Sequence, residues 1–136
     1  MHSLQKLARR YPHKRVLVTG ATNGLGKALA LQFAAAGFRV AVASRDPAKV
    51  AATVDEVNRA GGEGLALTLD VTRLEDFESA VAAVGAAWGG LDILVNNAGI
   101  LTAGKMADVG REVWEQSLRT DLWSVIDGCR LFLPLL

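Results

Sequence analysis

A glycine-rich segment between two regular stretches constrains the fold of this chain more than any other feature. Residues 19–26 carry glycines at positions 20, 24 and 26. They follow the short apolar run 15–19, which predicts a buried strand, and precede the alanine-rich stretch 25–36, which predicts a helix. Free N–H groups and the helix dipole favour anions at such a helix start. We therefore predict a phosphate-binding turn of a nucleotide site rather than an ordinary turn.

Each of the three glycines has a separate expected task. Gly20 permits a tight turn out of the strand, and Gly24 lets the backbone approach a pyrophosphate without a Cβ in the way. Gly26 allows the following helix to pack close to the sheet.

The rest of the chain alternates between strand-type and helix-type periodicity. Further strands are predicted at 39–44, 65–69 and 91–95, and further helices at 46–60, 72–88 and 111–133. Asp46 is the expected N-cap of one helix, while Thr72 and Glu75 have capping-box spacing for the next. This order predicts an α/β fold, a Rossmann-type doubly wound parallel sheet with helices on both faces and the first strand central. The apolar C-terminal end suggests a sequence truncated after the fifth main helix.

Two regions are expected along the chain, a basic N-terminal helical extension at 1–14 and a nucleotide-binding domain at 15–136. The extension has no acid and carries several Lys and Arg residues, so a phosphate-binding arm or a transit peptide is one interpretation. The simpler interpretation is a solvated helix whose Leu4 and Leu7 dock on the domain.

Composition excludes several classes of function. The 136 residues have a net charge of +1, which offers no global attraction for nucleic acid or anionic lipid. The apolar runs are too short for a transmembrane helix. A single cysteine excludes an internal disulfide and suits a cytoplasmic protein, and no metal-ligand spacing occurs, so no metal is expected.

Four segments in combination resemble the short-chain dehydrogenase/reductase family. They are the Gly-x-x-x-Gly-x-Gly turn, Leu69-Asp70-Val71, Asn96-Asn97-Ala98-Gly99, and the helix segment from Asp121-Leu122 to Leu133-Pro134. The resemblance covers essentially everything after Arg15. It implies an NAD(P)-dependent oxidoreductase that moves hydride between the coenzyme and a small carbonyl or alcohol substrate, with a homo-oligomeric full-length form.

The resemblance also assigns coenzyme contacts. Asp70 would bond the adenine amino group beside the Val71 backbone, and residues 97–99 would line the floor under the nicotinamide-side ribose. Two simpler interpretations stay open, since asparagines at a strand end often cap backbone groups and Asp70 could be a solvated acid. The complete predicted set is Gly20, Thr22, Asn23, Gly24, Leu25, Gly26, Ser44, Arg45, Asp70, Val71, Asn97, Ala98 and Gly99.

The choice of coenzyme follows from charge at the end of the second strand. An acid there would bind the ribose 2′-hydroxyl and repel a 2′-phosphate. This chain has Ser44 followed by Arg45, whose guanidinium can hold a phosphate with two hydrogen bonds. We therefore expect NADP, with NAD as the alternative. The same pair disfavours a methyltransferase, which would use an acid at this position.

The family's catalytic motif is absent from these 136 residues. No Tyr-x-x-x-Lys occurs, and Tyr11, the only tyrosine, precedes the predicted domain. The chain given is therefore expected to be inactive alone, and a non-catalytic dinucleotide-binding module is the alternative function.

One candidate catalytic residue lies within the chain. Asp121 stands where the family has an asparagine, so it could keep the oxygen acceptor of that residue but not its N–H donors. It borders a stripe of Leu118, Leu122, Val125 and Cys129 that is expected to face the core, and the alternative is a half-exposed acid at the rim of that stripe. Cys129 and the tryptophans at 88, 114 and 123 are expected to be packing residues.

Overall fold

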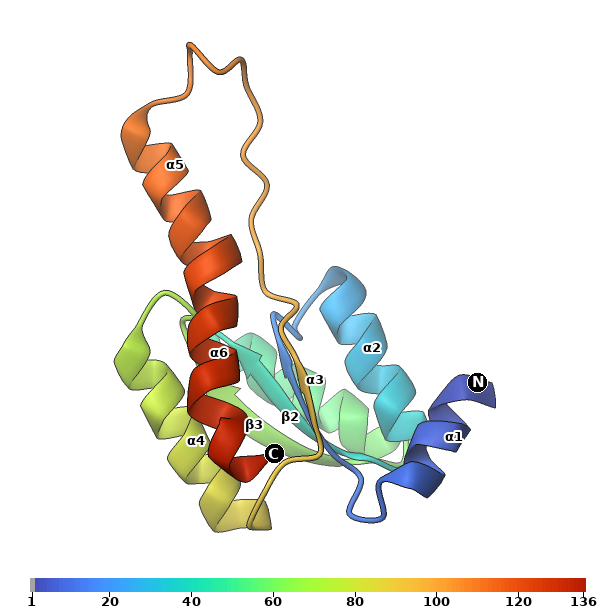
Figure 1. Ribbon diagram of the computed structural model, residues 1–136. Helices are drawn as coiled ribbons and strands as arrows, with labels where there is room; N and C mark the ends of the chain where they lie inside the picture. Colours follow the sequence, from blue (N-terminus) through green and yellow to red (C-terminus); the bar gives the residue numbers. More distant parts are fainter. Residues whose placement is uncertain (1) are drawn as a thin grey trace.

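The computed structural model describes residues 2–136 and contains a parallel sheet between two helical layers (Figure 1). The four strands are β1 (Arg15–Thr19), β2 (Arg39–Ser44), β3 (Glu63–Thr68) and β4 (Ile93–Val95). Their order in the sheet is β3-β2-β1-β4, and every pairing is parallel. The central place of β1 and the parallel direction confirm the Rossmann-type prediction.

Helices cover both faces of this sheet. Helices α2 (Gly24–Ala35) and α3 (Pro47–Arg59) contact each other on one face, and α4 (Leu74–Trp88) contacts α6 (Ser124–Phe132) on the other (Figure 1). Helix α1 (His2–Arg10) precedes β1. Helix α5 (Arg111–Leu118) runs through a π-helical turn (Arg119–Trp123) into α6, and the 3₁₀ turn Leu133–Leu135 follows.

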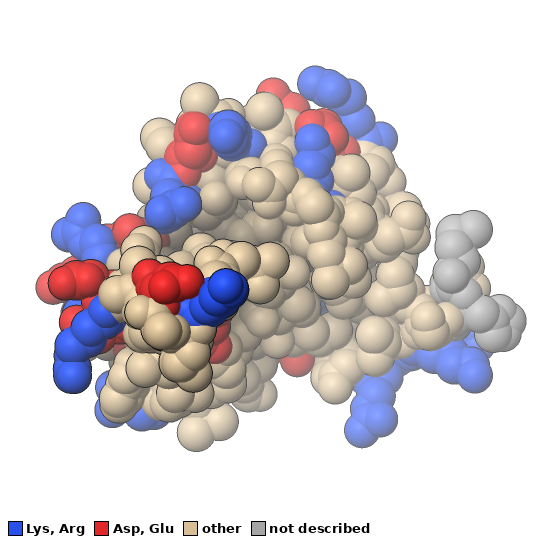
Figure 2. All heavy atoms as spheres, turned by 90° about the horizontal axis from the view of Figure 1, so that it is seen from above, with Lys and Arg blue, Asp and Glu red and all other residues tan. Residues whose placement is uncertain are grey.

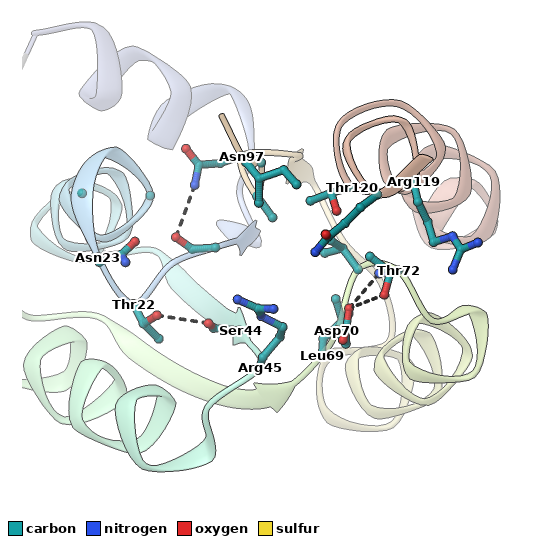
Figure 3. Close-up of a pocket in the computed structure, with 18 of the residues that line it drawn as sticks. Thr22, Asn23, Ser44, Arg45, Leu69, Asp70, Thr72, Asn97, Arg119 and Thr120 are labelled. Atoms are coloured by element: carbon teal, nitrogen blue, oxygen red, sulfur yellow. Dashed lines mark hydrogen bonds between the residues drawn. The ribbon is translucent and has the colours of Figure 1, made fainter. Parts of the chain in front are cut away.

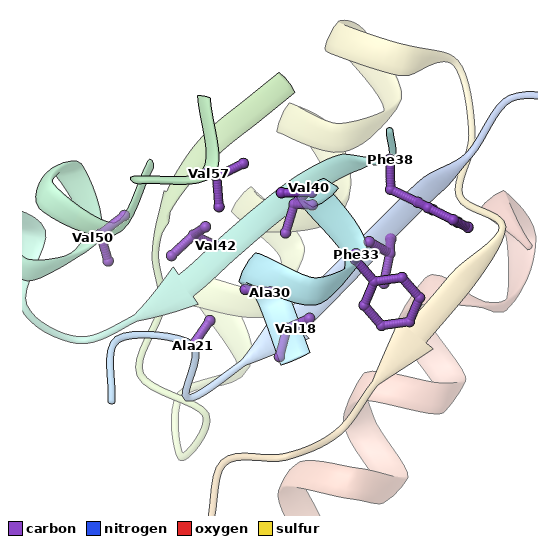
Figure 4. Packing of buried hydrophobic residues seen from close by; sticks show 11 residues of the cluster. Val18, Ala21, Ala30, Phe33, Phe38, Val40, Val42, Val50 and Val57 are labelled. Atoms are coloured by element: carbon purple, nitrogen blue, oxygen red, sulfur yellow. The ribbon is translucent and has the colours of Figure 1, made fainter. Parts of the chain in front are cut away.

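Two apolar clusters form the core, one on each face of the sheet. Alternate residues of β1 and β2 point to opposite faces, so both strands are buried almost completely. On one face Val18 and Val42 pack with Phe33 and Phe38, whose rings meet edge to face with centroids 5.0 Å apart (Figure 4). On the other face Leu17 and Ala41 of the strands pack beneath Phe77 of α4 and Phe132 of α6.

Helix α1 docks on the first of these clusters. Leu4, Leu7 and Ala8 are partly buried against it, as the sequence predicts for the two leucines. The division into an extension at 1–14 and a domain at 15–136 stays a prediction. Within residues 2–136, no helix combines the length and the apolar character that a membrane crossing requires.

The predicted helix ends are confirmed in part. Asp46 caps α3 by accepting hydrogen bonds from the backbone N–H groups of Ala48 and Lys49. Gly37 and Gly89 have positive φ angles of 78° and 70° where helices end. The prediction of a capping box by Thr72 and Glu75 is wrong. The N-cap of α4 is Arg73, whose side chain forms no capping hydrogen bond.

The direction in which the last long helix faces differs from the prediction. Leu118 and Leu122 are 52% and 50% exposed, and Cys129 is exposed, so the predicted core-facing stripe lies largely outward. The buried face consists of Ser117, Thr120, Ser124, Gly128 and Phe132. The reason is close approach to the sheet layer: a Cβ added at Gly128 would lie 2.6 Å from the Asn96 Oδ1 atom.

The prediction that all three tryptophans are packing residues is wrong for two of them. Trp88 is partly buried against the second core cluster, as expected. Trp114 and Trp123 are 39% and 56% exposed on the outer face of α5 and the π turn, so they are not core residues of this chain.

A partly buried ion pair joins the amino ends of β1 and β4. Asp92 accepts hydrogen bonds from the Arg15 backbone N–H at 2.9 Å and from Nε and Nη2 of its guanidinium at 3.1 and 3.0 Å. Arg15 Nη1 also donates to the Trp88 carbonyl. Burial alone raises the pKa of Asp92, but the hydrogen bonds and positive charge of Arg15, with a smaller contribution from His13, leave that pKa lowered.

This pair predicts a pH-dependent contribution to stability. We expect Asp92→Asn to lower the free energy of unfolding by about 2 kcal/mol at pH 7, because the amide lacks the charge and one acceptor. Because the pKa of Asp92 is lower in the folded state than in the unfolded state, the ionised carboxylate stabilises the fold at any pH above the ordinary pKa of an aspartate. This stabilisation is lost as the pH falls through the lowered pKa of the folded state. The difference between wild type and variant should therefore shrink below about pH 4 in urea titrations.

The exposed acid Asp55 of α3 supplies the control for this measurement. Asp55→Asn should change stability by less than about 0.5 kcal/mol. A loss in Asp92→Asn that stays constant down to pH 2.5 would contradict the assignment.

Candidate coenzyme site

A large cavity opens at the carboxyl ends of the strands. Its volume is about 650 Å³, and all of the predicted coenzyme contacts line it. The structure thus brings together segments that are separate in the sequence: the glycine turn, the end of β2, the end of β3 and the loop after β4 (Figure 3).

The glycine turn has the geometry that its residues predict. Gly20 and Gly24 have positive φ angles of 64° and 50°, which favour glycine. A Cβ at Gly26 would lie 2.3 Å from both the Gly20 carbonyl oxygen and the Asn97 Nδ2 atom, so no side chain fits there. A Cβ at Gly24 would meet no atom within 4 Å, because that position faces open space at the start of α2.

Thr19 joins this turn to the loop after β4. Its hydroxyl oxygen accepts the backbone N–H groups of Asn97 and Ala98, both at 3.0 Å, and the hydroxyl donates to the Val95 carbonyl at 3.4 Å. The Asn97 side-chain amide donates to the Thr19 carbonyl at 2.9 Å and to the Gly20 carbonyl at 3.3 Å. Asn97 therefore caps backbone groups and lines the cavity at the same time.

The sequence analysis missed Thr19 as a residue of the site. Its signal was available, since a hydroxyl residue directly before a glycine turn can bond to the neighbouring strand end. Asn96 has a different partner, the Cys129 Sγ atom at 3.4 Å, and does not line the cavity.

The glycine turn and the end of β2 together present two hydroxyl groups and a guanidinium to the cavity. The Thr22 hydroxyl donates to the Ser44 hydroxyl oxygen at 3.1 Å. Arg45 is exposed and lies between this pair and Asp70 in Figure 3. Asp46, which would repel a phosphate, is engaged as the N-cap of α3 and does not line the cavity.

Asp70 is held as a half-buried carboxylate at the end of β3. Its Oδ1 atom accepts the Thr72 backbone N–H at 2.9 Å and the Thr72 hydroxyl at 2.7 Å. Burial raises the pKa of Asp70, but these hydrogen bonds and the positive charges of Arg45 and Arg73 outweigh it and leave the pKa lowered. Asp70 is thus oriented by its own turn, and a carboxylate is available as an acceptor at the cavity wall.

One wall of the cavity comes from residues that the sequence analysis did not predict. Helix α5 and the π turn contribute polar side chains at intervals of three and four residues: Glu112, Glu115, Gln116, Arg119 and Thr120. The periodicity of these polar residues was the available signal. The apolar stripe of the same helix gives the stronger periodic signal and predicts a different face.

Asp121 does not line the cavity. Its Oδ1 atom accepts the backbone N–H of Ile100 at 2.8 Å, and Ile100 does line the cavity. The side chain is exposed, in agreement with the alternative that it is an acid at the helix rim. A role in proton transfer stays a prediction from the family resemblance.

Mixed charge surrounds the site. Seen from above the carboxyl ends of the strands, acidic and basic side chains are interspersed, and neither sign covers this face (Figure 2). Local groups such as Arg45 and Asp70 therefore set the electrostatics of the cavity.

A parallel sheet with a glycine turn and a cavity at the strand ends defines a Rossmann-type α/β domain. The sequence pattern of the short chain dehydrogenases matches residues 14–136. This chain belongs to that family.

Curated relatives are oxidoreductases by name. The chain is 33% identical over 128 residues to 2,5-dichloro-2,5-cyclohexadiene-1,4-diol dehydrogenase LinX of Sphingobium indicum, covering 94% of the chain and 51% of LinX. It is 37% identical over 122 residues to glucose 1-dehydrogenase of Gluconobacter oxydans, covering 89% of the chain and 46% of that enzyme. The chain spans about half the length of these two relatives.

Solved structures of reductases superpose closely on this chain. The NADH-dependent reductase A1-R′ complexed with NAD gives a TM-score of 0.83 at 30% identity, covering 90% of this chain and 52% of the reductase. L-sorbose reductase of Gluconobacter frateurii, complexed with NADPH and L-sorbose, gives a TM-score of 0.84 at 26% identity, covering 89% and 46%. A nicotinamide coenzyme is thus supported for this fold, in either phosphorylation state.

The contrast between two glycines tests the geometry of the turn. Gly26→Ala should lower the free energy of unfolding by about 3 kcal/mol, because its methyl group meets the Gly20 backbone, which cannot move away cheaply. Gly24→Ala should cost only about 1 kcal/mol, from the positive φ alone. Urea unfolding of both variants would measure this, and equal losses would contradict the close approach at Gly26.

Proposed function

We propose that this chain is the coenzyme-binding part of an oxidoreductase that transfers hydride between NADP(H) and a small carbonyl or alcohol substrate. The observation that carries the proposal is the convergence of the glycine turn, the β2 and β3 ends and the loop after β4 on one cavity. The cofactor-bound reductases with the same fold support a nicotinamide coenzyme.

The residues present fit a dinucleotide. The empty space at the Gly24 Cα is the kind of cradle that a pyrophosphate needs beside the N-terminus of α2. The Asp70 carboxylate would accept a hydrogen bond from the adenine amino group, and the Val71 backbone would border the adenine. Residues 97–99 would support the ribose next to the nicotinamide, because Thr19 holds that loop against the turn. The bound coenzyme supplies the hydride.

A preference for NADP is supported by three groups where the glycine turn meets the end of β2. Thr22 and Ser44 offer hydroxyl groups that can bond phosphate oxygens, and Arg45 offers a positive charge. No acid among the cavity-lining residues of this strand end would repel a 2′-phosphate. NAD is the alternative coenzyme.

The reaction needs proton-transfer groups that these 136 residues do not supply. No Tyr-x-x-x-Lys motif occurs in them, so the function proposed for this chain is binding and orientation of the coenzyme. A dinucleotide-binding module without turnover is the second candidate. Extending the coding sequence past Leu136 separates the two. A Tyr-x-x-x-Lys motif with NADPH-dependent turnover of aldehydes or ketones by the longer protein supports the enzyme, and coenzyme binding without either supports the module.

A homo-oligomer is part of the proposal. The outer face of α5, the π turn and α6 exposes Trp114, Leu118, Leu122, Trp123 and Ile126, and a group of large apolar side chains on one surface is typical of a protein–protein contact. A second copy offering the same face would bury it symmetrically. The single cysteine is what supports a cytoplasmic location.

The preference for NADP can be tested by coenzyme titration of this chain. We expect NADPH to bind at least about tenfold more tightly than NADH, and Arg45→Ala to remove most of that difference, because a charged hydrogen bond to phosphate is lost. Arg59→Ala, which removes an exposed arginine at the end of α3, is the matched control and should change neither affinity. Equal affinities for both coenzymes, unchanged in Arg45→Ala, would exclude the NADP preference.

The homo-oligomer can be tested by sedimentation velocity. Leu122→Lys should shift the protein toward monomer at micromolar concentration, because it places a charge in the centre of the exposed apolar face. Ala51→Lys, at an exposed position of α3, should leave the sedimentation coefficient unchanged. A wild-type chain that is monomeric at every concentration would contradict this proposal.

A further inference from the structure

Helix α1 and the turn after it concentrate positive charge that the coenzyme site does not use. Five of the fifteen Lys and Arg residues lie at positions 6–15, and none of the fourteen acids precedes Asp46. The net charge of +1 therefore combines a basic start with a remainder in which acids outnumber Lys and Arg. The family pattern begins at residue 14, so it does not account for this helix.

Some of these charges are already engaged within the domain. Arg15 pairs with Asp92. A Cβ at Gly37 would lie 3.9 Å from the Lys14 Nζ atom, so that ammonium lies near the C-terminal end of α2, where the helix dipole favours a cation. The exposed cations of α1 that form no salt bridge within residues 2–136 are Lys6, Arg9 and Arg10.

These three cations share one face of α1. Residues three and four positions apart are neighbours on a helix surface, so Lys6, Arg9 and Arg10 point to the same side. We call this surface the α1 basic face. The apolar side of the helix packs on the first core cluster instead. At the right-hand edge of Figure 2, the side on which α1 lies in Figure 1, the visible charged side chains are basic.

The α1 basic face is fixed to the sheet rather than carried on a loose arm. The Tyr11 N–H donates to the Leu7 carbonyl at 2.9 Å, and the Lys14 N–H donates to the Tyr11 carbonyl at 3.1 Å. The Lys14 carbonyl accepts the N–H of Arg39, at the start of β2, at 2.7 Å. The domain therefore presents the three cations in one orientation.

The groove beside these cations is too small for a ligand. It lies between α1 and α2 and has a volume of about 30 Å³, which holds only a few water molecules. Its walls are uncharged and consist of Leu4, Gln5, Gln32, Ala35 and Ala36. A partner of the α1 basic face must therefore offer negative charge over an extended surface rather than a single anion in a pocket.

Half-buried apolar side chains narrow the kind of partner further. Leu4, Leu7 and Tyr11 belong to the same helix and turn as the cations and keep part of their surface exposed. Cations beside apolar and aromatic groups suit the interface of a bilayer, where lipid phosphates meet acyl chains. A nucleic-acid duplex offers phosphates without such an apolar layer.

The α1 basic face lies far from the coenzyme cavity. Helix α1 meets α2 at Gln32, Ala35 and Ala36, near the C-terminal end of α2, whereas the glycine turn precedes its N-terminus. The twelve residues of α2 separate the two ends by about 18 Å. Figure 1 shows α1 beside the lower end of α2, and the loop after β4 extending in the opposite direction. A surface placed against α1 thus leaves the cavity open.

We propose that the α1 basic face docks this protein on an anionic lipid bilayer. The attachment is peripheral and reversible, because the cations attract the charged surface while the apolar side of α1 stays packed on the domain. The inference goes beyond the proposed function and does not rest on it, since membrane docking and coenzyme binding use opposite ends of α2.

Vesicle co-sedimentation tests the docking. At about 0.1 M NaCl, wild type should bind vesicles of phosphatidylcholine with about 30% phosphatidylserine, and about 0.5 M NaCl should release it. Vesicles of phosphatidylcholine alone should bind at least about tenfold less protein. The triple variant Lys6→Gln/Arg9→Gln/Arg10→Gln should lose on the order of a hundredfold in affinity for the anionic vesicles, because each cation near the surface contributes about fivefold.

A second triple variant removes the same charge from other exposed positions. Lys49→Gln/Lys105→Gln/Arg130→Gln is the matched control and should bind the anionic vesicles as wild type does. Both triple variants should keep the wild-type midpoint in urea unfolding, because the replaced side chains are exposed and glutamine suits a helix. If the α1 variant does not fold, the lipid and salt dependence of the wild-type chain still tests the inference.

Four results would overturn the inference. They are equal binding of wild type to neutral and anionic vesicles, unchanged binding of the α1 variant, equal losses in both triple variants, and tighter binding of a DNA duplex than of the vesicles at the same salt. The last result would assign the face to nucleic acid. Titration with NADPH keeps the proposed function separate: wild type that binds vesicles but no coenzyme would overturn that function and support the docking.

Discussion

The close approach of the glycine turn to the loop after β4 is the contact on which the site depends. The space that a Cβ of Gly26 would need is filled by the Gly20 carbonyl and the Asn97 side-chain amide. The Thr19 hydroxyl oxygen completes the junction by accepting hydrogen bonds from the backbone N–H groups of Asn97 and Ala98. Because β1 is central in the sheet, this junction holds the start of α2 and the end of β4 in one rigid arrangement. The cavity is the space left above it.

The electrostatics of the cavity follow from how each charged group is engaged. Asp46 is used by α3 as a cap, so its charge is directed at the start of that helix. Asp70 is bonded by Thr72 and stays ionised near Arg45, which lowers its pKa. One side of the cavity therefore offers a cation and hydroxyl groups, and the other offers an oriented carboxylate. This division suits a ligand with a phosphate near one end of its adenosine and an amino group on its base.

The α5, π and α6 helix has the opposite distribution of residue sizes from the one its apolar stripe predicts. Its small and polar residues face the sheet, since Gly128 must pass close to Asn96. Most of its large apolar residues face outward, and Phe132 is the buried exception. The π turn in its middle carries both a wall of the cavity and the acceptor for Ile100. One helix thereby joins the coenzyme site to the outer surface.

Local pattern determined where the strands and helices lie and the glycine turn, although β3 begins two residues before its predicted start and β4 two residues after. The runs at 15–19 and 39–44 match β1 and β2 residue for residue, because strands buried on both faces are apolar throughout and end at glycine or at a helix cap. The residues of the strand ends that line the cavity could also be predicted from the sequence, since a parallel sheet gathers strand ends at one edge. Only the tertiary structure decided which side of the last helix is buried, because the close approach of Gly128 to Asn96 requires a small residue there whatever the apolar stripe of the helix predicts. It alone showed the partner of Asp121, since a backbone N–H twenty-one residues away leaves no mark on the sequence around an aspartate.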